Sequence, residues 1–397
     1  MICRSIVPLI AMVLLIASGV SADEVKIDVN RADIARVNTP MTQTLDKDAA
    51  VDAGVVTLTA AGGQPLIAQV DKAGDGVVLR WVEPDLAAGA TKSYAIRPAG
   101  KPTSTFDFRD GDGSRDLRYG EANIWRDMIK WDEADRENTF KPFRHVFAFD
   151  RPGSKTFITK GPGGQYPHHR GIFFGFKASV DGEDLGDFWH GRPKVTQRHV
   201  KYLAEEEFAG PVAARVAAVT DWVRDDGKTA VVRDTRTSTT WRIADHHYVF
   251  DYDIAVRSLL DKPVKIFADA HHGGFHFRAS QQVAETRGAN GKPGSAKYVR
   301  PTSAKNNGND IWADCPWVQC AFEVDGRPYA VTIFDHPSNP RPTTFSTRPY
   351  GRFGAYFATD VSPAEPLRLK YRVVIRAGSA DSANALETAS QAFIAQK

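Results

Sequence analysis

The sequence predicts an all-β protein, an antiparallel β-sandwich preceded by a small β module and followed by one short helix. Three observations predict this fold. Short β-rich runs recur along most of the chain and are separated by Gly, Pro and Asp. Apolar and polar side chains alternate with a period of two over residues 248–256. Only the C-terminal segment, 380–397, repeats its apolar side chains at helical spacing.

The first predicted unit after the leader is a small β module over residues 23–100. Its β-rich runs are Val55–Thr59, Gly76–Trp81 and Ser93–Ile96. The segment Ala99-Gly100-Lys101-Pro102 predicts a boundary with the main domain, 101–379. A chain of 397 residues is long enough for two or three domains at roughly 100–200 residues each, so both units can bury a core.

The main domain carries the predicted sandwich. Its candidate strands are Phe143–Phe149, Arg170–Phe176, 248–256, Tyr329–Phe334 and Leu367–Ile375. In 248–256 one face is formed by Tyr248, Phe250, Tyr252, Ile254 and Val256, which is typical of a half-buried antiparallel strand. The architecture could be a large supersandwich of the mutarotase type. The helix in 380–397 is predicted by Ala383, Leu386, Ala389, Phe393 and Ile394, with Ser382 as its N-cap.

Residues 1–22 have the pattern of a secretory signal peptide. Arg4 precedes the apolar stretch 6–16, and Val20-Ser21-Ala22 offers a small-residue cleavage site. That stretch is shorter than the roughly 20 residues that span a membrane, and no later segment approaches this length. We therefore expect a periplasmic or secreted protein that begins at Asp23 and is not an integral membrane protein. In an oxidising compartment, Cys315 and Cys320 either form a local disulfide or stay free.

The charge balance and the histidines narrow the class of function. The chain has 51 Lys and Arg against 48 Asp and Glu, whereas a nucleic-acid-binding protein needs a concentrated basic footprint. We expect no nucleic-acid partner. All 11 histidines lie between His145 and His336, so the chemistry is expected in the main domain.

A first candidate motif is Tyr166-Pro167-His168-His169-Arg170-Gly171. It follows the glycine-rich loop 161–164 and precedes an apolar strand, and binding residues concentrate at such loop-to-strand junctions. His168 and His169 would act as acid or base, and Arg170 would bind a carboxylate or a polarised oxygen. The alternative is a pair of hydrogen-bonded structural histidines beside a solvent-facing arginine.

A second candidate motif is His271-His272-Gly273-Gly274-Phe275-His276. On an extended backbone, His272 and His276 face the same side about 13 Å apart, too far to share one metal ion directly. The glycines would leave room above a sheet for a substrate. The alternative is a buried polar histidine in the β core.

Two further segments complete the candidates. Asp187-Phe188-Trp189-His190 suits a sugar site, where the Trp189 ring stacks on the sugar and the polar groups bind hydroxyls. The two prolines of segment 335–341 predict a rigid loop, which presents Asp335, His336, Asn339 and Arg341, with Tyr350 following shortly. The alternatives are a core tryptophan and a structural loop.

Together these motifs resemble an uncharacterised bacterial family whose members are often labelled "methane oxygenase PmoA". The resemblance covers roughly residues 105–378, and the heptapeptide 335–341 is its most specific element. It implies a secreted β-sandwich protein that occurs alongside sugar-processing enzymes. This sequence departs from many members in having His271-His272 where they carry an acidic residue. A membrane methane oxygenase needs several spanning helices, which this sequence does not predict.

The leading hypothesis is a carbohydrate-active enzyme that acts on a glycoside or a uronic-acid-containing saccharide. Histidine acid/base chemistry fits β-elimination or epimerisation, and paired carboxylates at Asp187 and Asp335 would fit hydrolysis. The expected catalytic residues are His168, His169, Asp187, His272, Asp335 and His336. The expected substrate-binding residues are Arg170, Trp189, His190, His276, Asn339, Arg341 and Tyr350. The alternatives are a non-catalytic saccharide-binding protein and a histidine-ligated divalent-metal protein.

Overall fold

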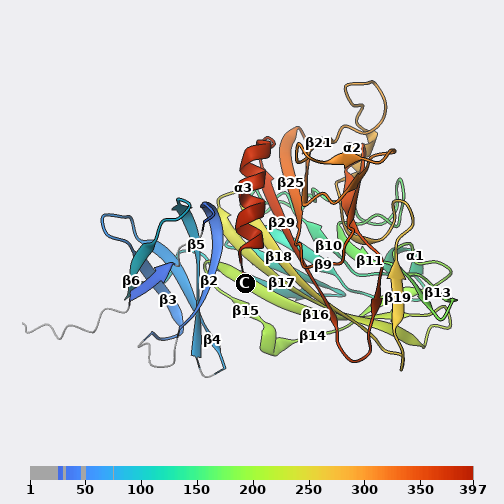
Figure 1. Cartoon of the computed structure of the whole chain (residues 1–397), viewed down its shortest axis with the longest axis horizontal. Coiled ribbons are helices and arrows are strands. Elements are labelled where there is room, and N and C mark those ends of the chain that lie inside the picture. Colours follow the sequence, from blue (N-terminus) through green and yellow to red (C-terminus); the bar gives the residue numbers. More distant parts are fainter. Residues whose placement is uncertain (1–25, 30–32, 46–50, 75, 397) are drawn as a thin grey trace, which may run out of the picture.

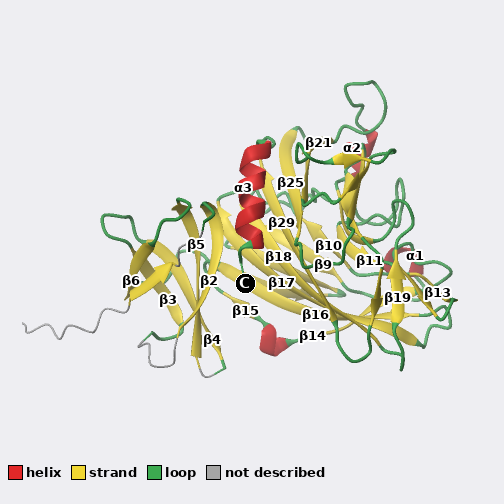
Figure 2. Cartoon of the chain, viewed as in Figure 1, coloured by secondary structure: helices red, strands yellow, loops and turns green. Residues whose placement is uncertain are grey.

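The protein is an antiparallel all-β protein with a C-terminal helix, which confirms the predicted fold class. The computed structural model describes residues 26–29, 33–45, 51–74 and 76–396, so the expected signal peptide lies outside the described residues. Strands make up 53% of the structure and helices 7%. Figure 2 shows the strands in yellow and the helices in red. The helical segments are α1 (Arg136–Thr139), the 3-10 turn η1 (Ala204–Glu206), α2 (Gln281–Glu285) and α3 (Ala383–Ile394).

The N-terminal segment forms a separate six-stranded antiparallel sheet, drawn in blue in Figure 1. Its strand order is β1 (Lys26–Val29), β6 (Lys92–Pro98), β3 (Gly54–Thr59), β4 (Leu66–Ala73), β5 (Gly76–Leu86) and β2 (Arg36–Leu45). The sheet has its own apolar core, which includes Leu58, Leu79 and Trp81. It contacts the main domain through Gln69, whose Oε1 accepts hydrogen bonds from the backbone N–H groups of Val212 and Ala213.

The main domain contains two large antiparallel sheets and a smaller one. The ten-stranded sheet runs β22 (Lys305–Asn306), β23 (Ile311–Ala313), β26 (Thr344–Arg348), β27 (Arg352–Tyr356), β20 (Gly274–Arg278), β11 (Ile172–Gly175), β10 (Phe143–Val146), β9 (Ala122–Met128), β8 (Ser114–Tyr119) and β7 (Phe106–Gly111). The nine-stranded sheet runs β14 (Thr196–Tyr202), β16 (Ala213–Val223), β17 (Ala230–Ala244), β18 (His247–Ser258), β29 (Leu367–Ala377), β25 (Arg327–Asp335), β24 (Trp317–Val324) and β21 (Lys297–Val299), with β15 (Phe208–Ala209) on β16. The four-stranded sheet is β13 (Glu183–Asp187), β12 (Lys177–Val180), β19 (Val264–Phe267) and β28 (Thr359–Val361).

The two large sheets pack face to face around one apolar core. Phe275 of β20 stacks on Tyr371 of β29 with ring centroids 4.6 Å apart, and Trp125 Nε1 of β9 donates a 2.9 Å hydrogen bond to Thr240 of β17. The predicted period-two strand is β18, and its apolar face from Tyr248 to Val256 is buried in this core. The alternation therefore identified the correct face of a central strand.

Helix α3 is the predicted C-terminal helix. The side chain of Ser382 caps it by accepting a hydrogen bond from the backbone N–H of Ala385. Its apolar face, with Leu386 and Phe393, packs on Trp317 and Phe334 of the nine-stranded sheet. In Figure 1 the helix stands beside β25 and β29, on the side of the N-terminal sheet.

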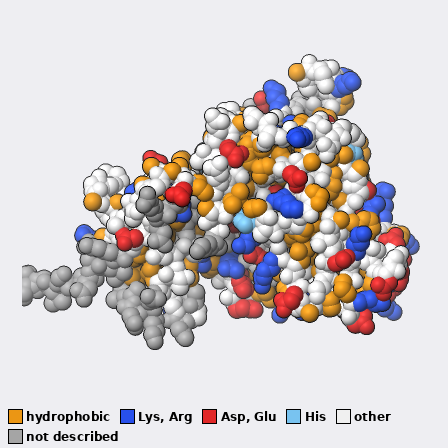
Figure 3. Space-filling model, in the orientation of Figure 1, with side chains coloured by type: hydrophobic (Ala, Val, Ile, Leu, Met, Phe, Trp, Pro, Cys, Tyr) orange, Lys and Arg blue, Asp and Glu red, His pale blue; other side chains and the backbone are white. Residues whose placement is uncertain are grey.

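Two further features of the molecule are the distribution of charge on its surface and the length of its helices. On the face drawn in Figure 3, acidic and basic side chains are interspersed among apolar ones. Within the described ranges, no helix is long and apolar enough to cross a membrane.

Cys315 and Cys320 are both buried free thiols, so the disulfide left open by the sequence does not form here. Burial raises the pKa of each thiol to about 12, and only the thiolate is a good nucleophile. We therefore expect the peptide that carries both cysteines to resist alkylation in the native protein and to take up two labels after denaturation. Mass spectrometry of that peptide measures this, and a native mass two hydrogens lower would contradict it.

Candidate active site

Strand β20 turns its side chains to opposite sides of the ten-stranded sheet. Phe275 and Phe277 belong to the core between the sheets, so His276 and Arg278 face the other side. On the neighbouring strand β27, Arg352 pairs with Arg278 and Gly354 pairs with His276. The outer face of this sheet therefore carries an imidazole and two guanidinium groups, and loops cover it.

The glycines near His276 serve chain packing. A Cβ on Gly274, at φ +84°, would lie 2.0 Å from the carbonyl oxygen of Ala355, and one on Gly354 would lie 2.6 Å from Cγ of His276. The expectation that Gly273 and Gly274 leave room for a substrate is thus wrong for Gly274, because strand β27 fills that space. Gly354 instead gives the His276 ring its place over the sheet.

Loops bring four histidines around the ring of Trp189, and strand β20 brings a fifth, His276. We name these five the histidine cluster. The centroid distances from Trp189 are 5.5 Å to His168, 5.1 Å to His169, 4.8 Å to His190, 4.9 Å to His272 and 5.3 Å to His276. Three separate sequence motifs therefore converge, as the sequence hypothesis requires. Trp189 itself is completely buried, which corrects its expected role: a ring without an exposed face forms the floor of the cluster and cannot stack on a sugar.

Two of these histidines are held in the same way, by an Asp-x-x-His turn. Asp187 Oδ1 accepts the backbone N–H groups of Trp189 and His190, and Asp187 Oδ2 lies 2.7 Å from His190 Nδ1. Asp269 Oδ1 repeats the arrangement, accepting from the N–H groups at positions 271 and 272 and lying 2.9 Å from His272 Nδ1. Asp187 is therefore a positioning residue, and Asp269 is a second one that the sequence analysis did not select.

The electrostatics of these turns fix the imidazole tautomer. Burial raises the Asp187 pKa, but the hydrogen bonds from His190 outweigh it and hold the pKa below its ordinary value. The Asp269 pKa is lowered in the same way, against burial, by the backbone N–H of His271 and by His272. An ionised carboxylate only accepts, so Nδ1 of each histidine donates. In its neutral form each imidazole then carries a lone pair on Nε2, which is the form of a general base.

Four histidines of the cluster are neutral near pH 7. Burial, followed by the charge of Lys141, lowers the pKa of His168 to about 2, and burial lowers that of His272 to about 4. Burial is also the main reason why the pKa values of His169 and His276 lie well below the ordinary value of histidine. Lys141 is itself buried beneath the cluster, where it donates to the carbonyl oxygen of Trp189.

Tyr350 joins the cluster, while Arg170 supports it from below. The Tyr350 ring stacks on His169 at 5.9 Å, and exposed Tyr166 packs against both rings. Arg170 is completely buried, and it donates to the backbone carbonyl oxygens of Pro167, Asn138 and Glu137. Its expected role in binding substrate is wrong, because every nitrogen of its guanidinium is engaged by the chain.

The loop 335–341 forms a separate group on the other sheet. Asp335 ends β25, is buried, and bonds to Arg341 at 2.6 Å and Asn339 at 2.7 Å. The ring of His336 packs on Phe393 of α3. Asp335 also neighbours Tyr371, a core residue between the sheets, so the ten-stranded sheet separates it from the histidine cluster. The expected roles of Asp335, His336, Asn339 and Arg341 in the site are therefore wrong, because this loop lies away from the histidine cluster. For the same reason Asp187 and Asp335 do not form a hydrolytic pair.

We expect Asp335→Ala to lower stability without changing chemistry at the histidine cluster. Removing the carboxylate leaves Asn339 and Arg341 unsatisfied, and about 2–3 kcal/mol of unfolding free energy is lost, since Arg341 stays partly solvated. Urea denaturation measures this loss. Unchanged stability combined with lost activity would make Asp335 a catalytic residue.

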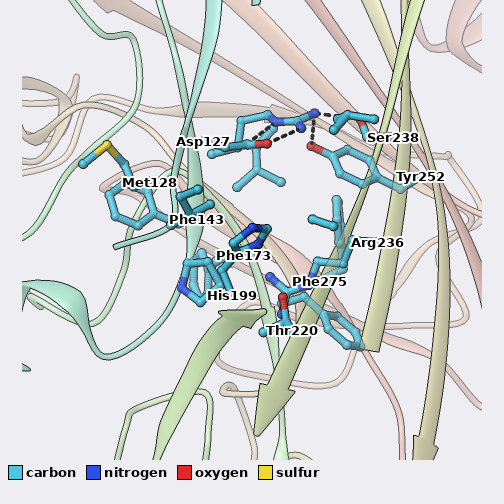
Figure 4. A pocket seen from close by; sticks show the side chains of 17 residues that line it. Asp127, Met128, Phe143, Phe173, His199, Thr220, Arg236, Ser238, Tyr252 and Phe275 are labelled. Carbon is cyan, nitrogen blue, oxygen red and sulfur yellow. Dashed lines mark hydrogen bonds and ion pairs between the residues drawn. The ribbon is translucent and has the colours of Figure 1, made fainter. Parts of the chain in front are cut away.

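The ion pair of Arg144 and Asp127 marks another polar region, a pocket between the two large sheets (Figure 4). Arg144 donates twice to Asp127 and once each to Ser238 and Tyr252. The free space is only about 50 Å³, which suits water and not a sugar ring. The charged pair and the hydroxyls of Ser238 and Tyr252 satisfy one another, so the histidine cluster remains the stronger candidate.

The described residues do not form a preorganised metal site. Among the residues with a described placement, no group of three or more His, Cys, Asp or Glu side chains is arranged to hold a metal ion. Histidines that ligate metal ions are also often held by a carboxylate on their other ring nitrogen. Four of the five histidines of the cluster are neutral bases near pH 7.

Comparison with known proteins places the chain in a family. The model of DUF6807, a family of unknown function, matches residues 112–390. The chain belongs to this family. The matched segment contains the whole histidine cluster and the loop 335–341. No curated protein matches the chain significantly.

Four residues around the cluster escaped the sequence analysis: Lys141, Asp269, Arg278 and Arg352. One signal could have revealed Asp269, because the Asp-x-x-His spacing of 187–190 recurs at 269–272. No sequence motif marks Arg278 and Arg352, because only the register of strands β20 and β27 brings them together.

Proposed function

We propose that this DUF6807 protein is a carbohydrate-active enzyme that works by histidine acid/base chemistry on a glycoside or a uronic-acid-containing saccharide. The observation that carries the proposal is the pair of Asp-x-x-His turns. A general base needs a fixed orientation and a free lone pair, and both turns supply them at His190 and His272. A protein that only binds sugars has no need for imidazoles held in one tautomer.

The spacing of the two bases favours one class of reaction. The ring centroids of His190 and His272 are 4.7 Å apart, too close for a sugar carbon to sit between them. Both imidazoles therefore address one face of a bound substrate, which favours β-elimination over an epimerisation with bases on opposite faces.

The β-elimination step needs a base for the C–H proton and a proton donor for the leaving oxygen. Nε2 of one imidazole takes the proton from the carbon next to the carboxyl group of a uronate. The electron pair of that C–H bond forms a carbon–carbon double bond as the glycosidic C–O bond breaks. That imidazole is then an imidazolium, and it passes the proton it has taken to the leaving oxygen, so protons and charge balance and the neutral base is regenerated.

A panel of matched polysaccharides tests the proposal. Each acidic glycan is paired with a neutral one of similar backbone, and ultraviolet absorbance follows the unsaturated uronate. Product from an acidic glycan supports the proposal. Saturable binding without any product favours the saccharide-binding alternative, and activity lost to a chelator and restored by a divalent ion favours the metal alternative.

A further inference from the structure

Two buried arginines, Arg278 and Arg352, lie side by side on the outer face of the ten-stranded sheet. They are direct partners in the antiparallel register of β20 and β27, and both side chains have no exposed surface. Across the described residues, neither forms an ion pair with a carboxylate. Two adjacent cations without a counter-charge are costly to bury, so this arrangement calls for a partner.

The hydrogen bonds of the two arginines leave the same edge of each guanidinium unused. Arg278 donates through Nη1 to the carbonyl oxygens of Ala279 and Tyr350, and Arg352 donates through Nη1 to the carbonyl oxygen of His271 and to Ser346. In both, Nε and Nη2 are buried and make no hydrogen bond of good geometry, although the Tyr350 hydroxyl lies near the Arg352 guanidinium. These two nitrogens form the edge of a guanidinium that binds a carboxylate or a sulfate in bidentate fashion.

The unsatisfied donors border the histidine cluster. The Arg278 guanidinium lies 4.9 Å from the ring centroid of Tyr350, and that ring stacks on His169. Both ring nitrogens of His169 are buried without a partner as well. The backbone carbonyl of His271, beside His272, holds Arg352. The aromatic rings of Tyr350 and exposed Tyr166 cover this region, so a ligand reaches the arginines by displacing side chains at the surface.

We infer that Arg278 and Arg352 form an oxyanion-binding subsite next to the histidine cluster, and that the substrate is an acidic saccharide bearing a carboxylate or a sulfate. This inference rests on the proposed function and narrows its substrate class. An anion on the guanidinium edges neutralises the buried charges and orients the sugar toward the bases. For a uronate, it also withdraws charge from the carboxyl group and so acidifies the neighbouring C–H bond.

Binding of small probes tests the subsite separately from catalysis. Calorimetric titration compares sodium glucuronate, its neutral methyl ester and inorganic sulfate at constant ionic strength. Wild type binds one or both oxyanions saturably and does not bind the ester measurably. Arg278→Gln and Arg352→Gln each raise the dissociation constant about 10- to 100-fold.

The matched control is Arg126→Gln, which removes an arginine of β9 in the same sheet that is already paired with Asp116. It binds the probes as wild type does. The inference is overturned if wild type binds neither oxyanion, or if both arginine variants bind as tightly as wild type. Wild-type titration decides the matter even if a variant fails to fold. Oxyanion binding without turnover of any glycan refutes the proposed function alone, and turnover of neutral glycans without oxyanion binding refutes this inference alone.

Discussion

Replacing His272 with asparagine lowers turnover by about 100- to 10,000-fold, the range for loss of a general acid or base. The asparagine amide can donate to Asp269 in place of imidazole Nδ1–H, so the turn is kept while the proton-transfer group is lost. We expect the loss in kcat, with KM changed little, because the acidic group of the substrate is bound elsewhere. Steady-state kinetics on the glycan identified by the panel measures both constants.

A matched control comes from a histidine outside the cluster. Burial lowers the pKa of His247 to about 4, as it does for His272, but His247 begins β18 on the other sheet. His247→Asn therefore keeps its activity. Asp269→Asn should lose activity by a smaller factor, because the amide no longer enforces the Nδ1–H tautomer. Equal activity in His272→Asn and His247→Asn would remove His272 from the mechanism.

Acidification from pH 7 to pH 5 destabilises the folded protein steeply. The pKa of His145 falls to about 3 and that of His168 to about 2, chiefly through burial, and those of His169 and His276 are also well below 6.5. Below pH 6.5 the unfolded chain binds protons that the folded chain does not, so the unfolding free energy falls with pH. Each such histidine contributes about 1.4 kcal/mol per pH unit.

The four together can remove about 5 kcal/mol per pH unit, which corresponds to a drop in Tm on the order of 10 °C or more. Thermal unfolding followed by circular dichroism from pH 8 to pH 4.5 measures the slope. His169→Gln should make it shallower, whereas His246→Gln, in an exposed turn, should not. A Tm that stays flat between pH 7 and pH 5 would mean that these imidazoles are protonated in the folded protein.

Local patterns predicted the elements whose environment is simple. The alternation in 248–256 and the cap at Ser382 identified β18 and α3, because period and capping are local properties. The histidine motifs were also found. What failed was the assignment of faces: Trp189 and Arg170 are in the right motif, but both are buried and point away from solvent.

Long-range register explains the remaining errors. Segment 335–341 looks like a binding loop, yet it closes on itself at the end of β25, on the sheet that does not carry the cluster. Conversely, Arg278 and Arg352 are 74 positions apart in sequence and meet only through the pairing of β20 with β27. Neither spacing nor composition reports which strands become neighbours.

Proton exchange tests the central claim most directly. The protein is incubated with acidic glycans in deuterium oxide, and mass spectrometry follows deuterium at the carbon next to the carboxyl group together with unsaturated product. We expect exchange or elimination in wild type that is lost in His190→Asn and His272→Asn and is insensitive to a chelator. Exchange and product that persist unchanged in both histidine variants would contradict it.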